Sequence, residues 1–313
     1  MDEKQTADWL KSCDCAEILT HRSPDGDTLG SAFALCAALR AMGKRANVIC
    51  PDPIPAKYGY LTDGCPKEDF VPQCVISTDV ADAQLLGSLR ETYEGRVDLA
   101  IDHHASHRPF AARLLLDGTA AAACQPVARV IDLLGVQFTP YIANCIYTGL
   151  STDTGCFRYP NTQPETHRLA ARMMECGCDA AKINRVMFEE KSRARVELEK
   201  QLLSDLRYEA DGKIAVMCLT QDEMHRTGAS DSDLDGFASQ IRQIEGVQIG
   251  VFLKETAKDT WKASVRTGEE VDASALCAKF GGGGHARAAG CTLTMSRREA
   301  VDALLAAAEP MLG

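Results

Sequence analysis

The sequence has few aromatic residues, no excess of basic charge and no long hydrophobic run. Phe, Trp and Tyr make up 6% of its 313 residues, and the net charge is −10 at pH 7. This composition argues against a broad nucleic-acid surface or an aromatic platform for long single strands. No apolar run approaches a membrane-spanning length, and the acidic residues 1–4 are not typical of a signal peptide. We therefore expect a cytoplasmic protein that binds neither a membrane nor long duplex nucleic acid.

Cysteine, by contrast, is abundant, with 14 residues scattered along the chain. Many lie inside apolar runs, and a chain of this length does not need disulfides for stability. The pairs Cys13/Cys15 and Cys176/Cys178 are spaced too tightly for the usual zinc-binding pair. The sequence therefore predicts free thiols in a reducing compartment.

The pattern of apolar residues changes along the chain and indicates two domains. The first part alternates short apolar strands with helical segments, which is typical of an α/β domain with a parallel sheet. The later part has paired strands over 208–219 and 247–266, which indicates a smaller α+β domain. A long polar helical segment separates the two parts. We expect a first domain over 1–188, a helical linker over 189–206 and a second domain over 207–313.

Three predicted strands of the first domain lead directly into acidic or imidazole side chains. These side chains are His21 with Asp25 and Asp27, then Asp79, then Asp102 with His103 and His104. Another carboxylate, Asp153, follows a predicted helix. Ligands of open α/β sheets bind beyond the carboxyl ends of the strands, so these groups are expected to meet there.

Converging carboxylates repel one another unless cations neutralise them. Two divalent metals, bridged by one Asp and roughly 3.5–4 Å apart, would do so, and would activate a hydroxide for attack on a phosphoryl group. Mixed imidazole and carboxylate ligands suit manganese, cobalt or iron better than calcium or magnesium. The alternative is that Asp79 and Asp153 are caps and that the histidines belong to the core.

The ordered set of motifs resembles the DHH–DHHA1 phosphoesterase superfamily over nearly the whole chain. The set comprises His21 with Pro24–Asp27, the isolated Asp79, the triplet Asp102–His104, residues 151–155, and the glycine-rich block 281–285. The length is most similar to the branch of nano-RNases and pAp phosphatases. The resemblance implies hydrolysis of short oligoribonucleotides (nanoRNA, pApA) and of 3′-phosphoadenosine 5′-phosphate (pAp).

The resemblance also implies a role for each residue of the first domain. One metal would be held by His21, Asp25 and Asp79, and the other by Asp27, Asp79, His103 and Asp153. Manganese is the preferred metal, with cobalt, iron or magnesium as alternatives. Asp79 would bridge the metals, Asp102 would orient His103, and His104 would contact the scissile phosphate or act as a general acid.

In the second domain, the glycine-rich block is expected to bind the remainder of the substrate. Successive glycines let the backbone approach an anion and form a phosphate-binding nest. The expected substrate-binding residues are Arg158, Arg266, Gly283, Gly284, His285 and Arg287. A flexible hinge is the alternative for a glycine run, but the flanking His285 and Arg287 and the family resemblance favour substrate binding here; an exposed ion pair would explain Arg158 almost as well.

Two features depart from the family pattern or stand outside it. Related chains commonly carry Ser or Thr followed by Glu where this sequence has residues 121–126, Ala-Ala-Ala-Cys-Gln-Pro. This departure puts local substrate contacts in doubt, though not the metals. His107, close to the triplet, is interpreted as a loop residue.

Several other functions are compatible with the sequence. The nearest alternative is a cyclic di-AMP phosphodiesterase. Inorganic pyrophosphatases have a similar first domain with the same kind of metal-binding residues, but the glycine-rich second domain argues against that activity. A non-catalytic nucleotide-binding regulator is an alternative of another class, although every expected metal position is filled. A homodimer is left open.

Overall fold

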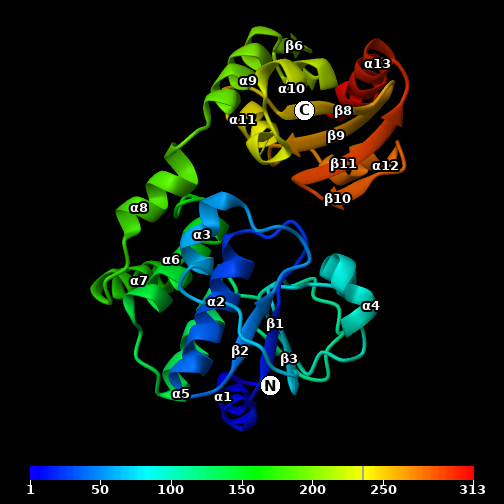
Figure 1. Ribbon diagram of the computed structural model, residues 1–313. Coiled ribbons are helices and arrows are strands. Elements are labelled where there is room, and N and C mark those ends of the chain that lie inside the picture. Colours follow the sequence, from blue (N-terminus) through cyan, green and yellow to red (C-terminus); the bar gives the residue numbers. More distant parts are fainter. Residues whose placement is uncertain (235) are drawn as a thin grey trace. The chain divides into compact units, whose positions relative to one another are not determined.

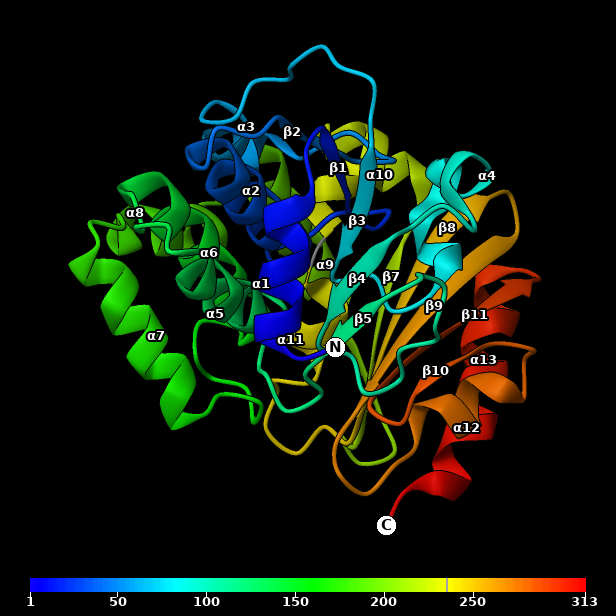
Figure 2. The same cartoon turned by 90° about the horizontal axis from the view of Figure 1, so that it is seen from below.

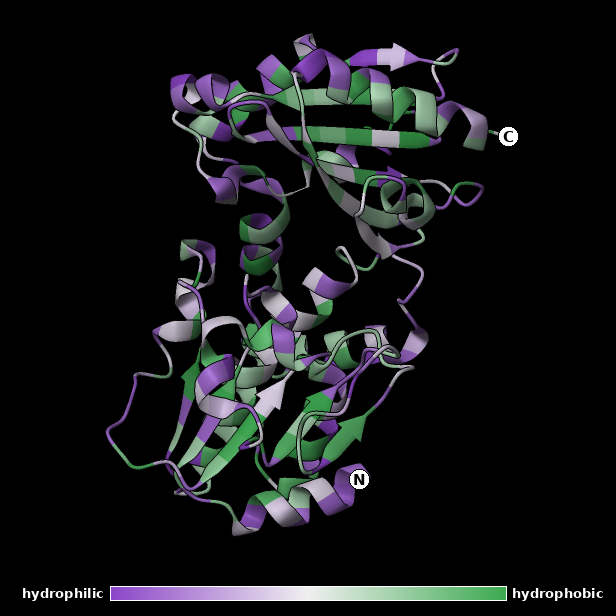
Figure 3. Ribbon diagram, turned by 90° about the vertical axis from the view of Figure 1, so that its right-hand side faces the viewer, coloured by the Kyte–Doolittle hydropathy of each residue, from purple (hydrophilic) through white to green (hydrophobic). Residues whose placement is uncertain are grey.

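Two separate β-sheets organise the chain. The computed structural model describes residues 1–234 and 236–313. It divides into two units, Met1–Glu190 and Lys191–Gly313, each built around its own sheet (Figure 1). The strands are largely hydrophobic, whereas most helices also carry polar residues (Figure 3). A parallel-sheet α/β domain followed by a smaller mixed domain, as predicted from the sequence, is confirmed.

The first sheet is entirely parallel, with the order β2-β1-β3-β4-β5. Its strands are β1 (Ala16–Leu19), β2 (Ala46–Ile49), β3 (Cys74–Thr78), β4 (Leu99–Asp102) and β5 (Leu114–Leu116). Leu19 pairs with Ser77, and Thr78 pairs with Ile101. The carboxyl ends of the three central strands therefore lie side by side.

Helices cover both faces of this sheet. The larger core lies under α1 (Glu3–Ser12), α2 (Gly26–Ala41), α5 (Cys124–Leu134) and α6 (Pro140–Asp153). A smaller apolar cluster on the other face includes Leu19, Val75 and Leu86, and is covered by the 3₁₀ segment Ala83–Leu89 and α4 (Arg90–Tyr93). Figure 2 shows α4 across the sheet from α2, α5 and α6. Shorter or peripheral helices complete the unit: α3 (Gly59–Thr62), α7 (Pro164–Glu175) and α8 (Ala180–Asn184).

Helix α1 was not predicted from the sequence, although its start carries a capping signal. Asp2 accepts a hydrogen bond from the Gln5 backbone, and the Gln5 side chain accepts one from the Asp2 backbone. Such a reciprocal pair satisfies free N–H groups at a helix start. The apolar face of α1 is short, which is why hydrophobic periodicity did not reveal it.

The second sheet has six strands in the order β10-β11-β9-β8-β7-β6. They are β6 (Arg207–Glu209), β7 (Ile214–Leu219), β8 (Ile249–Ala257), β9 (Thr260–Thr267), β10 (Gly283–His285) and β11 (Ala288–Thr294). The pairs β6–β7 and β8–β9 are antiparallel, in the two regions where the sequence predicts hairpins, whereas β7 and β8 are parallel.

Helices pack on both faces of the second sheet as well. One face is covered by α12 (Ala273–Ala278) and α13 (Arg297–Ala308), and the other by α9 (Arg193–Ser204), α10 (Gln221–Thr227) and α11 (Phe237–Ile241). Helix α9 occupies most of the predicted linker, and its Leu198 and Leu202 are buried in the core of the second unit. The domain limits at 188 and 206 stay a proposal. No helix within the described residues is long and apolar enough to cross a membrane.

Candidate metal centre

Six carboxylate and imidazole side chains gather at the carboxyl edge of the parallel sheet. Strand β1 leads to His21, β3 to Asp79 and β4 to His103, while Asp25 caps α2, Asp27 lies in its first turn and Asp153 ends α6. These are the residues that the family resemblance implies as metal ligands. The fold brings them together because adjacent parallel strands end at the same edge.

His21, Asp25 and Asp79 form the first group of ligand atoms. His21 Nε2 lies 3.5 Å from Asp25 Oδ1 and 3.6 Å from Asp79 Oδ2. The ring is held from its other side, where Nδ1 lies 2.8 Å from the backbone oxygen of Arg22. One ligand atom from each of the three residues lies within 4.8 Å of the others, which is close enough to hold a metal ion.

Asp27, His103 and Asp153 form the second group. His103 Nε2 lies 3.8 Å from Asp27 Oδ2 and 3.4 Å from Asp153 Oδ2. The same nitrogen lies 3.5 Å from Asp79 Oδ1. Asp79 therefore presents one oxygen to each group, as a bridging carboxylate would.

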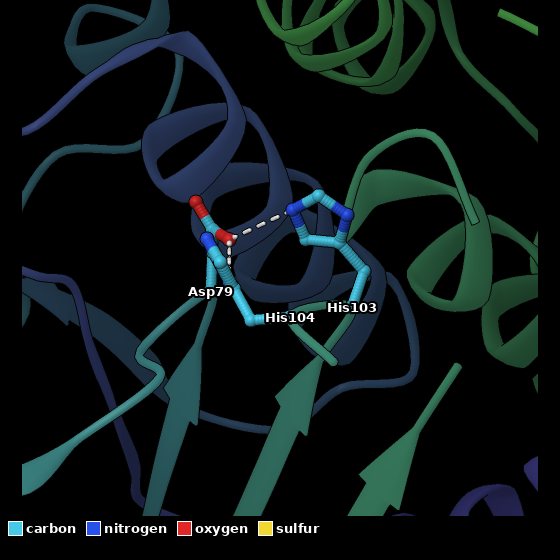
Figure 4. A group of neighbouring side chains, drawn as sticks. All are labelled: Asp79, His103 and His104. Atoms are coloured by element: carbon cyan, nitrogen blue, oxygen red, sulfur yellow. Dashed lines mark ion pairs between the residues drawn. The ribbon is translucent and has the colours of Figure 1, made fainter. Parts of the chain in front are cut away.

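His104 extends the cluster beside Asp79. Asp79 Oδ1 lies 3.5 Å from His103 Nε2 and 3.4 Å from His104 Nδ1, and dashed lines mark both ion pairs in Figure 4. Oδ1 is buried, yet it accepts no hydrogen bond from any described residue. A buried carboxylate oxygen without a donor is costly unless a cation approaches it.

The charges of the cluster shift the pKa values of its members strongly. Burial and the neighbouring Asp79 raise the pKa of Asp27 to about 7. Burial and the charges of Asp27 and Asp79 raise the pKa of Asp153 to about 9. Burial lowers the pKa of His103, but Asp79 and Asp27 outweigh that effect and raise it to about 10. All three shifts favour bound protons, which means that the cluster draws positive charge.

The donor set fits divalent cations. Asp79 Oδ1 is buried without a hydrogen-bond donor, and the pKa of the Asp27 carboxylate is raised. Imidazole nitrogens lie close to the same oxygens. All three features would be stabilised by a bound cation. Nitrogen and oxygen donors together suit manganese, iron or cobalt. Each of the two groups described above supplies three ligand atoms that lie close together.

Asp27 is positioned by close packing of helices far apart in sequence. Its carboxylate is buried and accepts hydrogen bonds from the backbone N–H groups of Ala123 and Cys124. A Cβ on Gly149 would lie 2.7 Å from Asp27 Oδ1, so glycine permits the approach of α6. Residues 121–126, which depart from the family pattern, thus contribute backbone donors that do not depend on side-chain identity.

Asp79 has an unusual backbone conformation for a non-glycine residue. Its φ is 60°, and its N–H donates a 2.9 Å hydrogen bond to the Ile101 oxygen on the neighbouring strand. Left-handed conformations of this kind carry strain and gather at functional sites. Asp79 follows directly on the last residue of β3, and its two oxygens lie beside His21 and His103.

In the second unit, two of the predicted substrate-binding side chains share one face of the sheet. His285 pairs with Ala288, and Ala288 pairs with Arg266 on the next strand. Directly paired residues point to the same side of a sheet, so His285 and Arg266 flank Ala288. His285 is exposed, and burial lowers the pKa of the half-buried Arg266.

The glycine-rich block is not a loop throughout. Gly283, Gly284 and His285 form β10 at the edge of the sheet, paired with β11. A Cβ on Gly284 would lie 2.6 Å from the Ala288 oxygen, so glycine permits this pairing. Gly281, with φ of 70°, makes the turn that precedes the strand.

Both other predicted arginines hold backbone oxygens of their own unit. Arg287 Nη1 donates to the oxygens of Gly268 (2.7 Å) and Val271 (2.8 Å). Arg158 Nε donates to the Gly155 oxygen at 2.6 Å. These contacts give each arginine a structural role that the sequence did not indicate.

His107 lies in the loop between β4 and β5, as interpreted from the sequence. Its side chain is nevertheless only 1% exposed, and its Nδ1 lies 2.6 Å from Asp102 Oδ2. The one available signal was its nearness to the triplet. Nothing in its local pattern indicates burial.

These features define a class: a two-unit α/β protein with a carboxylate–imidazole cluster, suited to divalent metals, at the edge of a parallel sheet. Residues 17–150 match the model of the DHH family, N-terminal domain, and residues 211–312 match that of the DHHA1 domain. The chain belongs to this DHH–DHHA1 family.

Curated relatives and a solved structure resemble the chain over most of its length. It is 35% identical to the bifunctional oligoribonuclease and PAP phosphatase NrnA of Thermus thermophilus, covering 88% of this chain and 83% of that protein. It is 25% identical to the Bacillus subtilis protein of the same name, covering 88% of this chain and 89% of that protein. An exopolyphosphatase-related protein from Bacteroides fragilis matches with a TM-score of 0.90 at 25% identity, covering 99% and 96%.

Proposed function

We propose that the chain is a metal-dependent phosphoesterase that hydrolyses short oligoribonucleotides, such as pApA, and pAp. The observation that carries this proposal is Asp79, whose two oxygens face two separate groups of ligand atoms. The names of the Thermus and Bacillus relatives state both activities, and the chain spans 83% and 89% of those proteins. This near-complete coverage favours the same substrates here.

The residues would divide between two metal ions, with manganese preferred. His21, Asp25 and Asp79 would hold one ion, and Asp27, Asp79, His103 and Asp153 the other. When bound, such ions supply an activated water and neutralise charge on the attacked phosphoryl group. Asp79 would be the ligand that both ions share, and His104 would face the scissile phosphate or protonate the leaving oxygen.

The second unit is proposed to bind the remaining part of the substrate. Arg266 and His285 lie on one sheet face and offer donors to a phosphate, next to the exposed backbone of Gly283 and Gly284. Arg158 stays the weaker candidate, and Arg158, Arg266 and Arg287 each also donate to a backbone oxygen. The proposed location is cytoplasmic, which the fourteen free cysteines favour.

A product assay on the purified full chain with Mn2+ tests the function. pApA, a short oligoribonucleotide, pAp and cyclic di-AMP are offered side by side. Asp79→Ala and His103→Ala are the inactivating variants, and His225→Ala, at an exposed position in α10, is the matched control.

The proposal expects turnover of the short linear substrates and pAp by wild type and His225→Ala, and none by the other variants. Preference for cyclic di-AMP would keep the mechanism and replace the substrate. Lack of turnover of all four would refute the substrate class, and pyrophosphate would be tested next.

A further inference from the structure

Asp102 is a fully buried carboxylate whose two oxygens have different partners. Oδ1 accepts hydrogen bonds from the backbone N–H groups of His103 (2.7 Å) and His104 (3.2 Å), and lies 2.8 Å from His104 Nδ1. Oδ2 lies 2.6 Å from His107 Nδ1. Each oxygen of Asp102 thus contacts one imidazole ring: Oδ1 contacts His104 and Oδ2 contacts His107.

His107 is fixed in place more firmly than His104. Its side chain is 1% exposed, and its ring stacks on Phe110 at 5.7 Å between centroids. Its Nε2 is buried with no partner in the part of the chain that the structure describes, so its contact with Asp102 is the one hydrogen bond of the ring. A residue packed in this way can anchor a neighbour.

His104, by contrast, is not held by packing. Its side chain is 42% exposed, and its Nδ1 lies 2.8 Å from Asp102 Oδ1 and 3.4 Å from Asp79 Oδ1, so the shorter contact, with Asp102, mainly sets the direction of the ring. That bond is only as well oriented as the carboxylate itself. The backbone N–H groups of His103 and His104 hold Oδ1, and the His107 ring holds Oδ2, so His107 completes the set of hydrogen bonds that fixes the plane of the carboxylate.

We propose that His107 is a positioning residue for the phosphoester reaction, acting on His104 through Asp102. This inference rests on the proposed function, in which His104 contacts the substrate. His107 fixes the plane of the Asp102 carboxylate, the carboxylate holds Nδ1 of His104, and Nε2 of His104 is thereby aimed away from Asp102. In other proteins, a residue that hydrogen-bonds to the far side of a functional imidazole likewise fixes the orientation of its ring.

Two substitutions separate positioning from packing. His107→Leu fills the buried site with an apolar side chain and removes the donor, whereas His107→Asn returns an N–H donor close to the position of Nδ1. We expect kcat of the leucine variant to fall about 10- to 100-fold, which is the loss typical when a residue that orients a functional imidazole is replaced. KM should change less than about twofold. The asparagine variant should recover most of this loss. His225→Leu, at an exposed position, is the control.

A spectroscopic measurement does not depend on turnover. In the full chain labelled with ¹⁵N-histidine and saturated with diamagnetic Mg2+, His104 Nδ1–H should give a low-field, slowly exchanging resonance. It should be retained in His107→Asn and lost in His107→Leu. Melting temperatures report any loss of fold separately.

The outcomes are distinct. A leucine variant with wild-type kcat, or one that loses stability while kcat per folded molecule is unchanged, would overturn the positioning role. So would an unaltered His104 resonance in that variant. If wild type hydrolyses none of the phosphoesters, the proposed function fails, and the resonance alone decides whether His107 orients His104.

Discussion

Replacing Gly149 by alanine tests whether close helix packing positions the candidate metal centre. Gly149 lies on α6 and faces Asp27 across the contact with α2. An added Cβ would lie 2.7 Å from Asp27 Oδ1 and 2.9 Å from Cys124 Sγ. Both distances are below ordinary van der Waals contact of about 3.5 Å. The Asp27 carboxylate cannot simply retreat, because the Ala123 and Cys124 N–H groups hold it.

Two energies oppose each other in this variant. Alanine in a helix interior gains about 1 kcal/mol over glycine. Overpacking a well-filled core costs about 1–3 kcal/mol. The net loss of stability is therefore small, about 0–2 kcal/mol, as the difference of these terms. Function should suffer more, because a displacement of about 1 Å at a reacting site can cost about 100-fold.

Calorimetric titration with Mn2+, thermal melting and pApA turnover measure the three effects. Gly59→Ala is the matched control, since an added Cβ there meets nothing within 4 Å. We expect weaker Mn2+ binding and lower turnover in Gly149→Ala alone. Wild-type Mn2+ affinity together with an equal or higher melting temperature would show that α6 does not constrain Asp27.

Three further predictions concern charge and hydrogen bonding. Mn2+ at about 100 times its dissociation constant should stabilise the fold by about 2.7 kcal/mol for each site that it fills, and a chelator should reverse this; an unchanged melting temperature would contradict the metal centre. In metal-free protein, the raised pKa values of Asp27 (about 7) and Asp153 (about 9) mean that the folded state keeps protons that the unfolded state releases. Stability should therefore fall between about pH 5 and 9 and depend less on pH with Mn2+; a rise in metal-free melting temperature over that range would refute this reasoning. Arg287→Ala should cost about 1–3 kcal/mol in denaturant unfolding, because the Gly268 and Val271 oxygens lose their donor. Unchanged stability with a raised KM would instead favour a substrate role for Arg287.

Much of the first unit is encoded locally. Short apolar runs that stop at His21, Asp79 and His103 identify strands and the edge at which their side chains meet. Helix α12, with 6 residues, escaped prediction because it is short, and the start of α1 is marked by the capping pair Asp2 and Gln5 and not by a long apolar run. Hydrophobic periodicity carries little information over such lengths.

The glycine-rich block shows where local chemistry misleads. Four glycines in a row favour a loop, yet Gly283–His285 form an edge strand. The partner strand decides this outcome, because β11 supplies the pairing and leaves no room for a side chain at Gly284. Strand β11 lies in the same unit as β10, but the register in which the two strands pair cannot be derived from the glycines themselves.

The chemical groups at the strand ends can be predicted from the sequence, because strand periodicity and the order of the motifs are local properties. Which of their atoms face one another depends on the folded structure. Helix α6 approaches Asp27 at Gly149, and His107 is buried against Phe110 and Asp102. No local sequence pattern predicts either contact. Close packing sets such positions to within fractions of an ångström, and packing exists only once the chain has folded.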